Sequence, residues 1–287
     1  MLAIGFALTA SAMFAIGSVM EARAAAAVTD HGGGAAGLMA RLVRERLWLG
    51  GVLVGGLGYV FHALALWSGS VVLVQVLITT TLLFALPLSA HWGGRVLGAR
   101  DLGLAVALSV SLAVFVAAGD PSAGLVRMPL AHWIPSFVVI GVVVGALAVT
   151  AGATHGRVRA GAFGAAAGTM FGLAAPLTKS TISLLSGGLH RVFTSWELYA
   201  LVVTGVIAIV LQQMSFQVGE FHAAFPATTV MEPLMGAVLG VAVLDEVVQT
   251  SDARLIALIV AVPTMIVTTT LLAMSEANAE TTVGEPS

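Results

Sequence analysis

Ionisable side chains inside long apolar stretches are the residues of this chain that could do chemistry. Glu232 lies in the apolar stretch 221–243, and Lys179, the only lysine of the chain, lies in the stretch 161–189. A charge at the centre of a membrane-spanning helix costs about 2.5–3.5 kcal/mol on insertion scales, so such residues usually serve a function. We predict that Glu232 and Lys179 line the pathway of a solute or ion. The alternatives are a Glu232–Lys179 pair that only joins two helices, and a Lys179 side chain that reaches the membrane surface.

Polar side chains at matching positions of the two halves are the next candidates. A shift of 150 residues places His62 on Gln212 and Thr79 on Thr229. If this shift reflects an internal repeat, His62 and Gln212 face each other across a central cavity; otherwise each forms a hydrogen bond across a helix interface. The predicted pathway consists of Glu232, Lys179, Gln75, His62, Gln212 and Thr229.

Prolines and glycines shape the same stretches. Pro176 precedes Lys179, and Pro226 and Pro233 flank Glu232. Because proline lacks the helix donor, we predict a helix break at each, with freed carbonyls available to a cation or a polar substrate group. Glycines at 164, 168 and 172 recur every fourth residue, which predicts close packing of this helix against the opposing half of the protein.

The composition indicates the elements that carry these residues. The chain has 287 residues, of which 59% are hydrophobic and 9% charged, with a mean hydropathy of +1.03. Soluble domains carry roughly 25% charged residues, so we predict an integral membrane protein. A span needs about 20 apolar residues. The fold class is then all-α, with nine transmembrane helices over residues 2–22, 47–67, 70–90, 102–118, 133–152, 160–185, 197–216, 221–243 and 255–274.

The order of the spans predicts two inverted repeats. Spans 1 to 4 correspond to spans 6 to 9, and this displacement by an odd number of spans reverses the second half in the membrane. Residues 1–152 then form the first repeat and the linking helix, with a polar loop at 23–46, and residues 153–275 form the second repeat. We expect the polar tail 276–287 to be disordered. Inverted repeats are typical of secondary transporters, whose site lies between the halves.

The basic residues predict the orientation. Eight arginines fall on one side of the spans, against three on the other, Arg127, Arg191 and Arg254. We therefore expect a multi-pass protein of the inner membrane with its N-terminus outside and its C-terminus in the cytoplasm. No basic residue precedes the first apolar stretch, so we expect that stretch to remain as a helix. Glu21 and Glu246 fall at span ends, where we expect interfacial or solvated side chains.

Several function classes are excluded or disfavoured. The net charge of −2 gives no support for nucleic-acid binding, and without cysteine there are no disulfides or thiolate metal sites. No nucleotide-binding loop, zinc-binding helix pattern or nucleophile elbow is present, so we expect neither an enzyme nor a cofactor. The expected partners are a small-molecule or ion substrate and the lipid bilayer. The sequence leaves open whether the chain is a monomer or a homodimer.

Two groups of residues resemble a known family. The run from Gly58-Tyr59 to Val74-Gln75 and Leu83–Pro87, and the run from Gln213 through Pro226-Ala227 and Pro233-Leu234 to Glu246, are similar to drug/metabolite transporters of the EamA-like superfamily. This resemblance covers most of the chain except residues 23–46 and the tail. It implies a transporter with alternating access. The count of nine spans is closer to the NIPA-like branch, which is associated with magnesium.

The choice of substrate class depends on the intramembrane charges. Mg²⁺ is usually bound through one or two carboxylates, and Glu232 is the metal ligand that we predict under this alternative. Because Lys179 would repel a cation, we predict a small organic metabolite or drug-like solute. A divalent-cation transporter and a membrane scaffold without transport are the alternatives.

Overall fold

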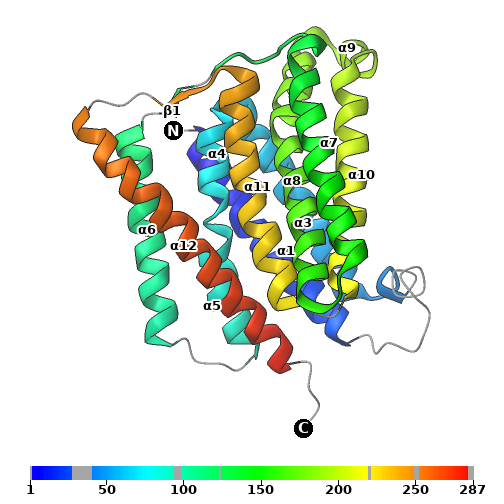
Figure 1. Cartoon of the computed structure of the whole chain (residues 1–287), viewed down its shortest axis with the longest axis vertical. Coiled ribbons are helices and arrows are strands. Elements are labelled where there is room, and N and C mark those ends of the chain that lie inside the picture. Colours follow the sequence, from blue (N-terminus) through cyan, green and yellow to red (C-terminus); the bar gives the residue numbers. More distant parts are fainter. Residues whose placement is uncertain are drawn as a thin grey trace.

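A computed structural model describes residues 2–27, 41–93, 98–119, 121–122, 124–218, 221–248 and 252–283. The helices lie side by side in one bundle; α1 begins at one end, and α12 ends at the other (Figure 1). The helices are α1 (Leu2–Ala27), α3 (Arg46–Ser68), α4 (Val71–Ile78), α5 (Thr81–Gly93), α6 (Ala99–Gly119), α7 (Leu130–Ala153), α8 (Gly156–Ser183), α9 (Leu189–Phe193), α10 (Trp196–Gln217), α11 (Phe221–Leu244) and α12 (Asp252–Val283). A short 3-10 helix, Leu184–Gly187, joins α8 to α9.

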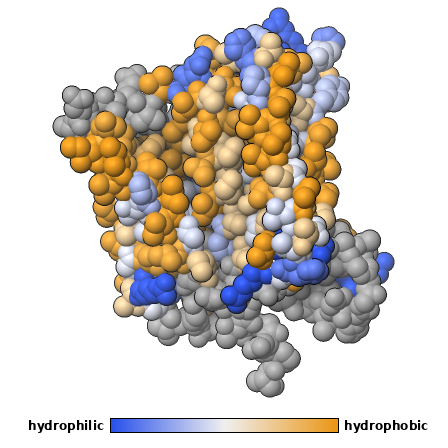
Figure 2. All heavy atoms as spheres, in the orientation of Figure 1, coloured by the Kyte–Doolittle hydropathy of each residue, from blue (hydrophilic) through white to orange (hydrophobic). Residues whose placement is uncertain are grey.

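The helices have the length and apolarity that a membrane requires. Among the described residues, eight helical segments are long and apolar enough to cross it, and α10 contains a shorter apolar stretch, Trp196–Gln212. Hydrophobic side chains cover the middle of the face shown in Figure 2, whereas hydrophilic ones gather toward its two ends. This distribution is expected where hydrocarbon surrounds the middle of a protein. The predicted all-helical class is confirmed.

The glycine stripe of α8 packs against α11. Ideal Cβ atoms at Gly164, Gly168 and Gly172 would lie 2.4, 2.6 and 2.7 Å from carbonyl oxygens of α11, those of Ala224, Thr228 and Glu232 respectively. Real side chains do not fit at these distances, so glycine is what allows the two backbones to meet. The close packing that we predicted is present. However, the partner is α11 of the same half, and the expectation of packing against the opposing half is wrong.

The prolines do not interrupt their helices. α8 continues through Pro176, and α11 continues through Pro226 and Pro233. The predicted breaks are absent because one missing donor leaves the rest of the helical hydrogen bonds in place, and the α8–α11 contact holds both helices.

A helix break lies in the third apolar stretch. There α4 ends at Ile78 and α5 begins at Thr81, with a turn at Thr79 and Thr80. The Thr79 and Thr80 hydroxyls donate to the carbonyls of Val76 and Leu77, each over 2.7 Å. Threonine side chains can compete with the helix in this way.

Two helices extend beyond their predicted bounds. α1 continues to Ala27, inside the predicted polar loop 23–46, of which residues 28–40 lie outside the described residues. α12 continues to Val283, so the expectation of disorder from 276 onward does not hold for its helical part. Alanine and glutamate in this segment favour a helix. Residues 284–287, which contain Gly284 and Pro286, lie outside the described residues.

Two short strands join segments that are far apart in the chain. β1 (Pro121–Ser122) pairs antiparallel with β2 (Val247–Val248). Next to them, the amide of Leu125 donates to the carbonyl of Leu244 over 2.7 Å. A Cβ atom at Gly124 would lie 2.0 Å from that carbonyl oxygen, so this approach requires glycine. We call the end of the bundle that carries β1 and β2 the β end; β1 is labelled there in Figure 1.

Candidate functional site

Glu232 lines a cavity of about 290 Å³ inside the bundle, which we call the polar cavity. Its walls come from both halves of the chain: α1, α3, α4 and α5 on one side, and α8, α10 and α11 on the other. Besides Glu232, its polar lining residues are Ser18, Glu21, Tyr59, His62, Thr79, Thr81, Gln212, Thr228 and Thr229. The backbone of Glu232 lies against Gly168 and Gly172 of α8. This close contact holds α11 beside the cavity.

Four of the predicted pathway residues meet in this cavity. Glu232 and Thr229 come from α11, His62 from α3 and Gln212 from α10. The structure therefore places His62 and Gln212 on one cavity, as the 150-residue shift suggested. Pro233, predicted as a helix break, also lines the cavity, although α11 is continuous there.

His62 supplies a buried imidazole to the cavity wall. The side chain is 4% exposed, and the rings of Phe14 and Tyr59 pack edge-on against it with centroids 6.0 Å away. Among the described residues, its Nε2 atom has no hydrogen-bond partner. A buried polar atom without a partner costs free energy unless a ligand or water satisfies it. His62 is therefore suited to hydrogen-bond a bound solute.

Glu21 is a second carboxylate in the polar cavity. We expected an interfacial side chain because Glu21 ends the first apolar stretch, and the apolar span of α1 does end at Glu21. The sequence did not predict its place in the cavity wall. Helix packing explains that place: Glu21 lies against Gly51 of α3, where a Cβ atom would come within 2.8 Å of its Cγ atom. The available signal was the small-residue pair Gly51 and Gly55, which leaves room for a side chain from the neighbouring helix.

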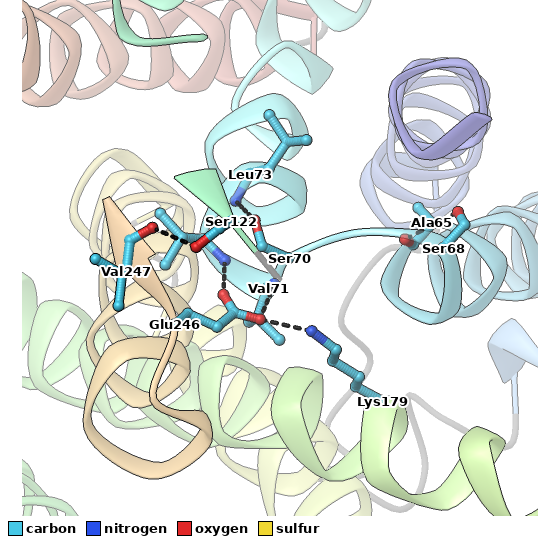
Figure 3. Close-up of polar contacts among 10 residues, drawn as sticks. Ala65, Ser68, Ser70, Val71, Leu73, Ser122, Lys179, Glu246 and Val247 are labelled. Carbon is cyan, nitrogen blue, oxygen red and sulfur yellow. Dashed lines mark hydrogen bonds and ion pairs between the residues drawn. The ribbon is translucent and has the colours of Figure 1, made fainter. Parts of the chain in front are cut away.

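Lys179 does not line the polar cavity. It is 2% exposed, and its Nζ atom lies 2.6 Å from Oε1 of Glu246 (Figure 3). The Glu246 carboxylate also accepts the backbone amides of Val71 and Val72 over 2.6 and 2.8 Å. These amides are free donors because they begin α4, and a helix N-terminus favours negative charge. Glu246 thus joins α8 to the start of α4.

This geometry corrects three expectations. Lys179 is paired with Glu246 and not with Glu232, and its side chain ends inside the bundle and not at a solvated surface. Glu246 is buried, with 2% exposed, and is not a solvated span end. The reason lies in the next residue, because Val247 pairs with Ser122 in the strand ladder and turns the chain back over the bundle.

Gln75 of α4 is buried against α11, outside the polar cavity. It is fully buried, and a Cβ atom at Gly236 would lie 2.6 Å from its Cγ atom. Neither atom of its amide has a hydrogen-bond partner among the described residues. The structure therefore does not bring Gln75 to the other predicted pathway residues.

Tyr59 and Thr178 form a further contact between the halves. Their hydroxyl oxygens, from α3 and α8, lie 2.6 Å apart. Tyr59 also lines the polar cavity, whereas Thr178 is next to Lys179 in α8. The halves are thus joined beside the cavity by this hydrogen bond and by the bonds from the Val71 and Val72 amides to Glu246.

A second ion pair lies outside the cavity, between Arg127 and Glu197. Nε of Arg127 lies 2.5 Å from Oε1 of Glu197, which is completely buried. The hydrogen bond to Glu197 raises the pKa of Arg127 above its ordinary value. This pair joins the segment before α7 to the start of α10.

The charges of the polar cavity have one sign. Among its described lining residues, Glu21 and Glu232 are acidic and none is lysine or arginine. The described residues include no group of three or more His, Cys, Asp or Glu that could hold a metal ion. The cavity can therefore hydrogen-bond a solute and favour a positive charge.

One comparison with known proteins decides the family. An uncharacterized protein of Corynebacterium glutamicum is 31% identical over 273 residues, which are 95% of this chain and 94% of that protein. The chain belongs to the same family as this protein. No family model matches the chain, and no solved structure matches it. The function is therefore inferred from the residues of the polar cavity.

Proposed function

We propose that this protein is a secondary transporter or facilitator that moves a small organic solute across the inner membrane by alternating access. The observation that carries the proposal is the polar cavity with Glu232, which lies inside an apolar bundle and is lined by helices from both halves. Its volume of about 290 Å³ is near the lower end of ligand pockets, which begin at about 300 Å³. A cavity of this size suits a small solute or headgroup.

The proposal includes the repeat architecture. α1, α3, α4 with α5, and α6 form the first repeat, α7 is the linking helix, and α8, α10, α11 and α12 form the second, inverted repeat. The break between α4 and α5 supports this reading, because transporter sites commonly lie at discontinuous helices. With nine spans and the arginine distribution, the β end faces outside. The resemblance to drug/metabolite transporters supports the same architecture.

The mechanism that we propose separates the halves at the β end. In this structure the bonds from the start of α4 to Glu246, the Tyr59–Thr178 hydrogen bond and the β1–β2 ladder hold the halves together there. Opening toward the outside requires these contacts to break, while the opposite end closes around Glu21 and Gln212. Glu232 exchanges its proton or a cationic solute during this cycle, which couples transport to an ion gradient.

Magnesium is a second candidate, and one observation favours it. Glu21 and Glu232 line the same cavity, and Mg²⁺ is usually bound in proteins through one or two carboxylates with several waters. Under this reading Glu232→Asp retains much of the transport, because the carboxylate remains, whereas Glu232→Gln loses it.

The test is gradient-driven uptake into proteoliposomes. The uptake of small amines, amino acids, carboxylates and sugars is measured for wild type, for Glu232→Gln and for the exposed control Glu45→Gln. Uptake of Mg²⁺ is followed with an entrapped indicator. We expect wild type and Glu45→Gln to take up one solute class, with uptake by Glu232→Gln reduced at least about tenfold. Equal uptake by wild type and Glu232→Gln would remove Glu232 from the mechanism. No uptake of any probe by wild type would favour the scaffold alternative.

A further inference from the structure

A second cavity lies next to the polar cavity and differs from it in chemistry. It has a volume of about 480 Å³ and lies between α4, α6, α11 and α12. Apolar side chains dominate its lining, among them Val76, Phe115, Val238, Val241, Met265 and Ile266. We call it the apolar groove. Such a lining offers almost nothing to a polar group and suits a hydrocarbon chain.

The two cavities share part of their wall. Thr79 and Pro233 line both of them. Thr79 lies at the turn where α4 ends, so the helix break is located between the cavities. Pro233 follows Glu232 in the chain. A ligand held at Glu232 can therefore place a chain past Pro233 into the apolar groove.

The apolar groove opens on the outer surface of the bundle. Val238 and Val241 of its α11 wall are 49% and 48% exposed. α11 and α12 approach each other near the end marked C and diverge toward the β end (Figure 1). The surrounding surface is hydrophobic in Figure 2, as expected for a surface that faces lipid. A hydrocarbon chain can thus enter the groove directly from the bilayer.

The charges of the polar cavity select the headgroup. Glu21 and Glu232 favour a cation, and two carboxylates without a lysine or arginine in the lining disfavour an anionic group. His62 and Gln212 add hydrogen-bonding groups for an amine or a hydroxyl.

We infer that the substrate is an amphiphile with a cationic amine or ammonium headgroup, bound by Glu232 and Glu21, and a hydrocarbon chain that lies in the apolar groove. This inference rests on the proposed transport function and specifies its substrate class. A bilayer lipid could also fill the groove without any role for the polar cavity, and the experiment separates the two occupants.

The test is photolabelling of the protein in lipid nanodiscs. The probe is decyltrimethylammonium with a diazirine at the end of its chain, and labelled peptides are mapped by mass spectrometry. We expect labelling of the groove walls of α11 and α12, reduced about tenfold by Glu232→Gln because the headgroup loses one of its two charge partners. Val241→Trp fills the groove and removes the labelling, whereas Ile256→Trp, at a lipid-exposed site outside the groove, leaves it unchanged.

A decanoate probe with the same diazirine controls for partitioning into the bilayer. We expect it to label lipid-exposed positions of α7 to the same extent as the ammonium probe, but the groove much less. Equal groove labelling by both probes, or labelling that does not depend on Glu232, would show that the groove holds bilayer lipid and would overturn the inference. If the groove is unlabelled while proteoliposomes still take up another solute, the inference fails and the transport proposal stands.

Discussion

Lys179 of α8 and Glu246, which follows α11, form a buried ion pair with 2.6 Å between Nζ and Oε1. The same carboxylate accepts two amides at the start of α4, so one side chain joins three segments of the chain. A buried charge is tolerated where a partner and hydrogen bonds compensate it. The pair therefore holds Glu246 in place at the closed β end, and the separation of Glu246 from the two α4 amides is the step that we propose for opening.

Removing one member of this pair should destabilise the protein. Lys179→Met leaves the Glu246 carboxylate buried without its cation, and we expect a loss of about 3–5 kcal/mol. Arg44→Met, at an exposed site, is the control. Thermal unfolding of the purified variants measures the difference. In the double variant Lys179→Met/Glu246→Met no charge is left unpaired, so its loss should be smaller than the sum of the single losses. A Lys179→Met protein as stable as Arg44→Met would contradict the role of the pair.

Substitution by alanine should have opposite effects at Gly168, which lies in the α8–α11 contact, and at Gly205, which lies outside it. A methyl group at Gly168 would lie 2.6 Å from the carbonyl oxygen of Thr228, so Gly168→Ala should destabilise the protein by about 1–3 kcal/mol. At Gly205 of α10 nothing lies within 4 Å, and Gly205→Ala should stabilise the helix by about 0.5–1 kcal/mol. The melting temperature of each variant is measured against that of wild type. Similar effects of both would show that the α8–α11 approach is looser than in this structure.

The sequence predicts local features well and long-range pairing poorly. Apolar stretches predict the helices because a helix satisfies its own backbone groups in lipid. The glycine spacing around Gly168 likewise predicts close packing, although not its partner. The partner of Lys179 could not be predicted, because Glu246 lies next to a strand pair, Ser122 with Val247, that joins residues far apart in the chain. The break at Thr79 was missed because prolines are the stronger local signal, whereas threonine acts only through its side-chain hydrogen bond.

A disulfide between β1 and β2 would hold the β end closed until it is reduced. Ser122 and Val247 are directly opposed in the antiparallel pair, where Cα atoms lie about 4.5–5.5 Å apart, within the range of a disulfide. The chain has no cysteine, so Ser122→Cys/Val247→Cys introduces the only pair. We expect the cross-link to form under oxidation and to abolish uptake into proteoliposomes, and dithiothreitol to restore it. Each single variant is the control. Full uptake by the cross-linked protein would mean that the β end does not open.

Glu21 should contribute to solute binding, although it ends its apolar stretch. Glu21→Gln removes one of the two carboxylates of the polar cavity, and we expect about tenfold weaker binding of a cationic solute. The concentration dependence of uptake measures this, with Glu45→Gln as the exposed control. Unchanged half-saturation in Glu21→Gln would place the solute away from α1.

Accessibility of Thr229 from the two sides of the membrane tests alternating access most directly and requires no known substrate. Thr229→Cys puts a thiol of similar size in the polar cavity of a chain without other cysteines. A membrane-impermeant maleimide is applied from each side. Ser186→Cys at the β end and His155→Cys at the opposite end report which side is exposed to the reagent. We predict that Thr229→Cys reacts from both sides, whereas each control reacts from one. Reaction of Thr229→Cys from one side only, or from neither, would contradict a transporter that opens its cavity alternately.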